Sequence, residues 1–312
     1  MIEFTNTRAN HLVDPFLQVW GWEIPVYLFL GGLVAGMMAI AGWFLFADRH
    51  RKADSFMSLV PGLGLVLLSL GMGALFLDLE HKPYVWRLYT TFEPASPMSW
   101  GAWILVAVYP ALLGALLLSV PAFLRERLPA LATLSDRMRA SARVVRGIAA
   151  ANLVLGGLLG IYTGVLLSAL GARPLWSSAV LGPLFLASGL SSAAALGHLV
   201  ARDRAESEWL ARADNRFLQA EIVLIALFLI GLMSATQVHI RAAGLVLGGP
   251  FTAVFWVGVV GIGIVLPLSI QSLAVGHRIH HTPVAPLLVL AGGLLLRIVI
   301  VYAGQVSRWG PV

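Results

Sequence analysis

The chain has 312 residues, of which 59% are hydrophobic and only 12% are charged. Soluble globular proteins carry about 25% charged residues, so this composition excludes that class. The formal net charge is +6, but the basic residues lie in the gaps between apolar blocks, where membrane topology selects them, which argues against nucleic-acid binding. Cysteine is absent, which excludes disulfides and any iron–sulfur cluster held by thiolates of this chain.

Apolar blocks of about 20 residues recur along the whole chain, and a helix of that length crosses roughly 30 Å of hydrocarbon. A transmembrane β-barrel would show short alternating segments instead. The sequence therefore predicts an all-α integral membrane protein, a single transmembrane domain over residues 1–312 with eight transmembrane helices. These helices are expected near residues 22–46, 57–79, 99–123, 148–170, 177–200, 216–238, 251–275 and 284–304.

The basic residues predict the orientation. Fourteen of the 21 Lys and Arg lie in the loops after the first, third, fifth and seventh helices, and six lie on the opposite face. Because short loops rich in Lys and Arg stay in the cytoplasm, both termini are predicted to be outside, in the periplasm of a bacterial inner membrane. The basic cytoplasmic loop 121–147 is either a helix on the lipid surface or a solvated linker.

The two halves of the chain share motifs in the same order. Pro-x-aromatic-Leu-x-x-Gly-x-x-x-Ala occurs in the first and fifth helices, and a Pro six residues before a Trp begins the third and seventh. Paired glycines occur in the fourth and eighth helices. We interpret these matches as two parallel four-helix repeats, roughly 22–171 and 177–305, with chance similarity between apolar helices as the alternative. Small residues are expected to let the helices approach closely, at Gly31, Gly32, Gly36, Gly156, Gly157, Gly292 and Gly293.

Polar residues at membrane depth are costly and therefore mark candidate sites. An outer group comprises Glu23, Tyr27, Asp78, Tyr162 and Arg297. The guanidinium of Arg297 requires an anion or strong hydrogen-bond acceptors, and Asp78 could provide the anion if the second and eighth helices are neighbours. The two tyrosines could donate hydrogen bonds to a ligand carbonyl, or they could be ordinary residues of the interfacial aromatic belt, and an Arg–Asp pair could be purely structural.

An inner group comprises Asp214, Glu221 and Gln271. The two acids are seven residues apart, so they share a helix face and could begin a proton path from the cytoplasm. A helix-capping Asp and a buried neutral Glu would explain them equally well.

The histidines argue against an internal haem, because a bis-histidine site needs two imidazoles facing each other within the spans. The histidines lie in loops or at helix ends instead. We also expect no metal site in this chain, and we interpret His277, His280 and His281 as titrating loop residues.

Several segments along the whole chain resemble the NrfD/polysulfide-reductase membrane subunit family. They are residues 20–32, 78–83, 96–101, 160–164, 188–191 and 290–305. The resemblance implies an eight-helix quinone-binding subunit that has no redox centre of its own and no independent catalysis. It also implies that a ferredoxin-like iron–sulfur subunit docks on the periplasmic face and contacts a large catalytic subunit, often a molybdopterin enzyme.

In family terms, Tyr27 and Tyr162 correspond to residues that hydrogen-bond a menaquinone or ubiquinone near the outer face. Asp78, Arg297, Asp214 and Glu221 correspond to polar positions linked to the quinone pocket or to proton transfer. Two other functions remain open from the residues alone: a secondary transporter with a polar solute path, and a purely structural membrane anchor. The chemistry of the terminal substrate belongs to a different polypeptide.

Overall fold

The computed structural model describes residues 20–47, 54–275 and 282–309, in which all regular structure is helical. Eight helices of this described part are long and apolar enough to cross a membrane, so the predicted number of spans is confirmed. They are α1 (Glu23–Phe46), α2 (Asp54–Asp78), α4 (Pro97–Leu118), α7 (Ala142–Ser168), α8 (Leu181–Val200), α9 (Arg204–Met233), a π-helix η3 (Val254–Val265) continued by α11 (Leu266–Val275), and α12 (Val284–Val306). The predicted histidine cluster at 277–281 lies outside the described residues.

In the part of the chain that the structure describes, five short helices connect these spans. They are η2 (Lys82–Tyr84) and α3 (Arg87–Thr90) before α4, α5 (Ala122–Arg127) and α6 (Pro129–Ala140) between α4 and α7, and α10 (Gln237–Gly244) after α9. The basic segment 121–147 is thus largely helical, and its position on a lipid surface or in water stays a prediction. Ser141 caps α7 by accepting a hydrogen bond from the backbone N–H of Val144, so α7 begins before the predicted residue 148.

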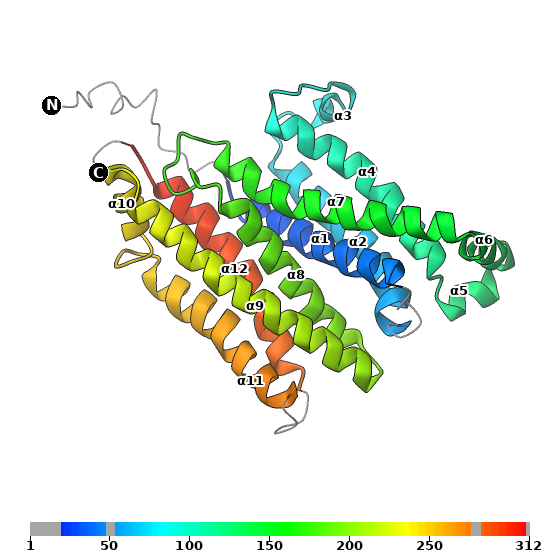
Figure 1. Ribbon diagram of the computed structural model, residues 1–312. Helices are drawn as coiled ribbons and strands as arrows, with labels where there is room; N and C mark the ends of the chain where they lie inside the picture. The colour runs from blue at the N-terminus through cyan, green and yellow to red at the C-terminus, as the bar shows by residue number, and fades with distance from the viewer. Residues whose placement is uncertain (1–19, 48–53, 276–281, 310–312) are drawn as a thin grey trace.

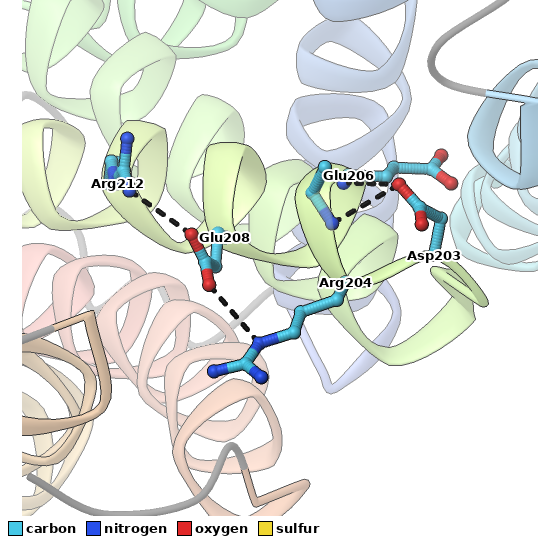
Figure 2. A network of polar contacts seen from close by, with 6 residues as sticks. Asp203, Arg204, Glu206, Glu208 and Arg212 are labelled. Carbon is cyan, nitrogen blue, oxygen red and sulfur yellow. Dashed lines mark hydrogen bonds and ion pairs between the residues drawn. The ribbon is translucent and has the colours of Figure 1, made fainter. Parts of the chain in front are cut away.

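Helix α9 begins at Arg204, well before the predicted start at residue 216. The carboxylate of Asp203 accepts hydrogen bonds from the first free backbone N–H groups at 3.1 and 3.3 Å. Glu208 then pairs with Arg204 at 3.3 Å and with Arg212 at 3.1 Å, each one helical turn away (Figure 2). These charged turns extend the helix beyond its apolar block, which is why hydropathy placed the start too late.

The long helices pack as two groups of four, α1, α2, α4 and α7 in one, and α8, α9, η3–α11 and α12 in the other. In each group the first helix contacts the second and the fourth, and the third contacts the same two helices. The groups meet where α8 packs against α1 and α7 and where α12 packs against α1 (Figure 1). Two repeats would give this shared pattern of neighbours, and the repeat itself stays a prediction.

Glycines bring α1 and α8 into backbone contact. A Cβ atom at Gly36 would clash with the carbonyl of Gly189, and one at Gly189 would clash with the carbonyl of Gly32. Gly156 on α7 packs in the same way against the backbone of α1. The prediction is wrong for Gly157, because a Cβ there would meet no described atom within 4 Å. The glycines that do face a neighbouring helix allow the close packing that holds helices together in lipid.

Hydrogen bonds hold the residue range before α1 against the last turn of α12. The backbone N–H of Trp20 donates to the side-chain oxygen of Gln305 at 3.0 Å, and the Gln305 amide nitrogen donates back to the Trp20 carbonyl at 3.0 Å. Trp20 also stacks on Trp176, with ring centroids 5.1 Å apart. The start of α1 and the end of α12 therefore lie on the same side, as an even number of crossings requires.

We predict that Gly36→Ala lowers the free energy of unfolding by about 1–3 kcal/mol, because the added methyl group forces α1 away from α8. Denaturant unfolding in detergent micelles measures this change. Gly157→Ala is the matched control, and it should be neutral or slightly stabilising because alanine favours the helix. Equal destabilisation by both variants would contradict the proposed role of the α1–α8 contact.

Candidate functional site

The outer residues Glu23, Tyr27, Asp78 and Tyr162 come together at one end of the bundle. Glu23 and Tyr27 lie in the first turns of α1, Asp78 is the last residue of α2, and Tyr162 lies near the end of α7. Since α2 and α7 both run antiparallel to α1 and pack against it, their last turns lie beside its first turns. Residues from separate motifs of the sequence thus lie together at one end of the bundle.

The two tyrosines are buried inside the bundle. Tyr27 is 5% exposed and Tyr162 is 6% exposed, and they lie close enough to interact electrostatically. This burial argues against the belt interpretation, since belt residues face the lipid headgroups. Neither hydroxyl hydrogen-bonds to any residue that the structure describes, although a buried tyrosine hydroxyl usually has a partner. Both are therefore able to donate to a ligand.

Tyr89 of α3 is a third member of this cluster, and no signal in the sequence pointed to it. It also interacts electrostatically with Tyr27, and burial raises its pKa. Tyr89 belongs to the connection between α2 and α4, so neither hydropathy nor spacing could have identified it.

A glycine makes room for the ring of Tyr162. A Cβ atom at Gly101 of α4 would clash with the Tyr162 ring and hydroxyl. Ahead of it, Ser99 accepts a hydrogen bond from the Glu93 backbone N–H at 3.0 Å and so fixes the preceding loop to the start of α4. The contact between Gly101 and Tyr162 joins the segments 96–101 and 160–164, which are two separate motifs in the sequence.

Asp78 and Glu23 bring two acidic groups to this end of the bundle. Both side chains are partly exposed, and Asp78 interacts electrostatically with Glu23 and with Lys82. These groups can exchange protons with water at the rim, while the tyrosines lie deeper.

Arg297 does not pair with Asp78, so the predicted ion pair is wrong. The principal neighbours of α12 are α1, α8, η3 and α11, whereas α2 packs mainly on α1, α4 and α8. The fully buried guanidinium instead donates to the Ser188 hydroxyl, and also to the Phe185 carbonyl at 3.0 Å and to the Gly293 carbonyl at 3.0 Å. It also interacts electrostatically with Glu221 of α9, although the two side chains form no direct ion pair.

Glycines also create the space that the guanidinium occupies. A Cβ atom at Gly32 would lie 3.0 Å from one terminal nitrogen of Arg297, and one at Gly293 would lie 3.6 Å from the other. The phenyl ring of Phe185 lies under the guanidinium, 4.9 Å from ring centroid to Cζ, in cation–π geometry. The glycine pairs of α1 and α12 thus admit a charged side chain as well as a neighbouring backbone.

The inner residues Asp214, Glu221 and Gln271 are buried and interact with one another or with the same helix α8. Asp214 accepts hydrogen bonds from Ser191 at 2.6 Å and from the Gln271 amide at 2.7 Å. Glu221 hydrogen-bonds to Ser188 and interacts electrostatically with Asp214. Neither acid is a helix cap, because both lie well inside α9.

Ser188 and Ser191 connect the two halves of this network, and the sequence alone indicated no role for them in it. They are three residues apart on α8 and so share a face, with Asp214 beside one and Glu221 beside the other. Matching this spacing to the two acids could have suggested the contact, but only if α8 and α9 were known to be neighbours. The resulting chain of polar groups runs from Asp214 through the serines to Glu221 and Arg297.

Arg297 and Glu221 should be coupled in stability. We predict that Arg297→Leu lowers the free energy of unfolding by about 3–5 kcal/mol, because it leaves a buried carboxylate without its counter-charge. Adding Glu221→Gln should recover part of that loss, giving a coupling energy of about 1–3 kcal/mol in a double-mutant cycle.

The control cycle pairs Arg297→Leu with Asp78→Asn, which should add independently to within about 0.5 kcal/mol. Denaturant unfolding of the purified protein in micelles measures all five variants. Coupling to Asp78 rather than to Glu221 would overturn the assignment of the charge partner.

The protein is similar to known proteins over nearly its whole length. Residues 9–307 match the protein family described as "Polysulphide reductase, NrfD". The Escherichia coli K12 protein named "Protein NrfD" is 33% identical, over 97% of this chain and 99% of its own length. One of the polypeptides of the Wolinella succinogenes polysulfide reductase is 31% identical, over 92% of this chain and 94% of its own length. "Protein NrfD homolog" of Haemophilus influenzae is 30% identical, over 93% of this chain and 95% of its own length.

Proposed function

Because the protein belongs to the polysulphide reductase NrfD family, we propose that it is the quinone- or quinol-binding membrane subunit of a respiratory oxidoreductase. One relative is named as a single polypeptide of a polysulfide reductase, which supports membership of a multi-subunit enzyme. The proposed partners are a ferredoxin-like iron–sulfur subunit on the periplasmic face and a large catalytic subunit, of molybdopterin or similar type. The quinone is menaquinone or ubiquinone, and in this proposal the protein supplies neither haem nor iron–sulfur cluster.

The observation that carries the proposal is the pair of buried tyrosines, Tyr27 and Tyr162, whose hydroxyls have no partner among the described residues. A quinone carbonyl is a hydrogen-bond acceptor on an apolar ring, so it suits a pocket with apolar walls and two convergent donors. Glu23 and Asp78 at the rim supply acidic groups close to the same place. The proposed site therefore contains both the donors that hold a quinone and groups that exchange protons with water.

Quinone reduction consumes two electrons and two protons, and quinol oxidation releases them. In the proposed mechanism the electrons pass directly between the quinone and the iron–sulfur partner. The network of Asp214, Gln271, Glu221 and Arg297 lies deeper. Its carboxyl groups and the hydroxyls of Ser188 and Ser191 provide groups along which protons can move from the inner end. The Gln271 amide oxygen has no partner among the described residues, so it can accept a hydrogen bond from water on this path.

The proposal also includes an orientation of the protein in the membrane. The two groups of four helices are parallel repeats, and both termini lie in the periplasm. The uneven distribution of Lys and Arg and the shared pattern of helix neighbours support this arrangement. It puts the tyrosine end toward the iron–sulfur partner and the Asp214 end toward the cytoplasm.

Tyr162→Phe tests the binding site. We expect the KM for a soluble quinone analogue to rise about two- to tenfold in the assembled complex, because one hydrogen bond to the quinone is lost. Tyr84→Phe is the control, since Tyr84 lies in η2 at the same end of the bundle but is 52% exposed. An unchanged KM for Tyr162→Phe, with the partner subunits still co-purifying, would refute the site and favour a purely structural anchor.

Glu221→Gln tests the proton path. We expect turnover with the quinone analogue to fall at least about tenfold while its KM changes little, because the amide cannot carry a proton. Glu208→Gln on the same helix is the control, because Glu208 only forms surface ion pairs with Arg204 and Arg212. Equal turnover in Glu221→Gln and the wild type would exclude Glu221 from the path.

A further inference from the structure

A large cavity lies at the end of the bundle opposite the tyrosines. Its volume is about 990 Å³, which is at the upper end of the range of roughly 300–1,000 Å³ for small-molecule sites. It is enclosed by the last turn of α1, the first turns of α2 and α7, the end of α4, and parts of α5 and α6. Because these are the ends of membrane-crossing helices, the cavity opens where the bundle meets the membrane surface.

The polar side of the cavity is strongly basic. Arg125, Arg139, Arg146 and Arg202 line it, and no acidic residue is among its described lining residues. Ala142, the first residue of α7, also lines it, so the positive end of that helix dipole faces the same space. The charge and the helix end both favour an anion.

Two of these arginines are fixed by the protein and two are available. Arg125 pairs with Asp136 at 2.6 Å, and the Nε of Arg139 donates to the Leu118 carbonyl at the end of α4. The side chains of Arg146 and Arg202 form no hydrogen bond or ion pair with any residue that the structure describes, and both are exposed. Their charges can therefore pair with a bound anion.

The other side of the cavity is apolar and faces outward. Phe46 is 62% exposed, Phe123 is 57% exposed and Leu59 is 41% exposed, and all three line the cavity. A free anion would gain nothing from these side chains, whereas acyl chains would cover them. We propose that this cavity binds an anionic phospholipid, with the phosphate at Arg146 and Arg202 and the acyl chains along Phe46, Leu59 and Phe123.

Lipid titration of the purified full-length protein tests this proposal. Native mass spectrometry from a neutral detergent compares phosphatidylglycerol with phosphatidylcholine of the same acyl chains. We expect phosphatidylglycerol to bind at least about tenfold more tightly, and the variant Arg146→Gln/Arg202→Gln to lose about tenfold of that affinity. Arg146→Lys/Arg202→Lys should retain most of it, because the charge is kept.

The matched control is Arg127→Gln/Arg143→Gln, which removes the same charge from α5 and α7 but outside the cavity lining. It should change the affinity less than about twofold, because these side chains do not reach the proposed phosphate position. Equal binding of the two lipids, or equal loss in the control, would overturn the proposal. So would a thermal stabilisation by inorganic phosphate alone as large as that by phosphatidylglycerol, since it would identify a site for the free anion.

Discussion

The permanent charge of Arg297 is the constraint on which the core of this protein depends. Hydrocarbon cannot solvate a guanidinium, so the protein must surround it with acceptors and a counter-charge. Two carbonyls, the Ser188 hydroxyl, the Phe185 ring and the Glu221 carboxylate supply these from three helices. Helices α8, α9 and α12 must therefore keep a fixed register around one side chain.

The same side chain relates the two polar groups of the molecule. One of its terminal nitrogens lies against Gly32, five residues beyond Tyr27 on α1 and so about 7–8 Å further along that helix. On the other side, Ser188 and Glu221 connect it with Ser191 and Asp214. Arg297 thus lies between the buried tyrosines and the buried acids, at the place where the two groups of four helices meet. A proton path from the inner end to a quinone at the tyrosines would pass this point.

At the inner end of the bundle, unlike at Arg297, the arginines that the structure describes are not buried in the core. There the arginines lie at helix ends, where water and headgroups can reach them, and several stabilise the protein directly, as Arg204 and Arg212 do with Glu208 (Figure 2). Arg146 and Arg202 lack such partners among the described residues and face a cavity with apolar walls. An anionic lipid in this cavity would join α1, α2 and α7 at their ends and so support the half of the bundle that holds Tyr27 and Tyr162.

The sequence by itself determined the membrane class, the eight spans, the family and most residues of the two polar groups. It could do so because the cost of exposing backbone and charge to lipid acts on local composition, which a single sequence displays. Spacing of seven residues even predicted that Asp214 and Glu221 share a face. The long charged start of α9 escaped prediction, since its capping and ion pairs do not register as hydrophobicity.

Only the tertiary structure decided which helices are neighbours, and therefore which side chains meet. It brought Arg297 within electrostatic reach of Glu221 rather than beside Asp78, and it brought Ser188 and Ser191 into the network. It also added Tyr89 to the tyrosines and placed Gly101 against Tyr162. Lipid tails solvate the apolar surface of any of these helices equally well. Hydropathy therefore does not indicate which helices are neighbours. Those partners are selected by close packing at glycines and by the need of buried polar groups for one another, and both act across distances in sequence that no local pattern records.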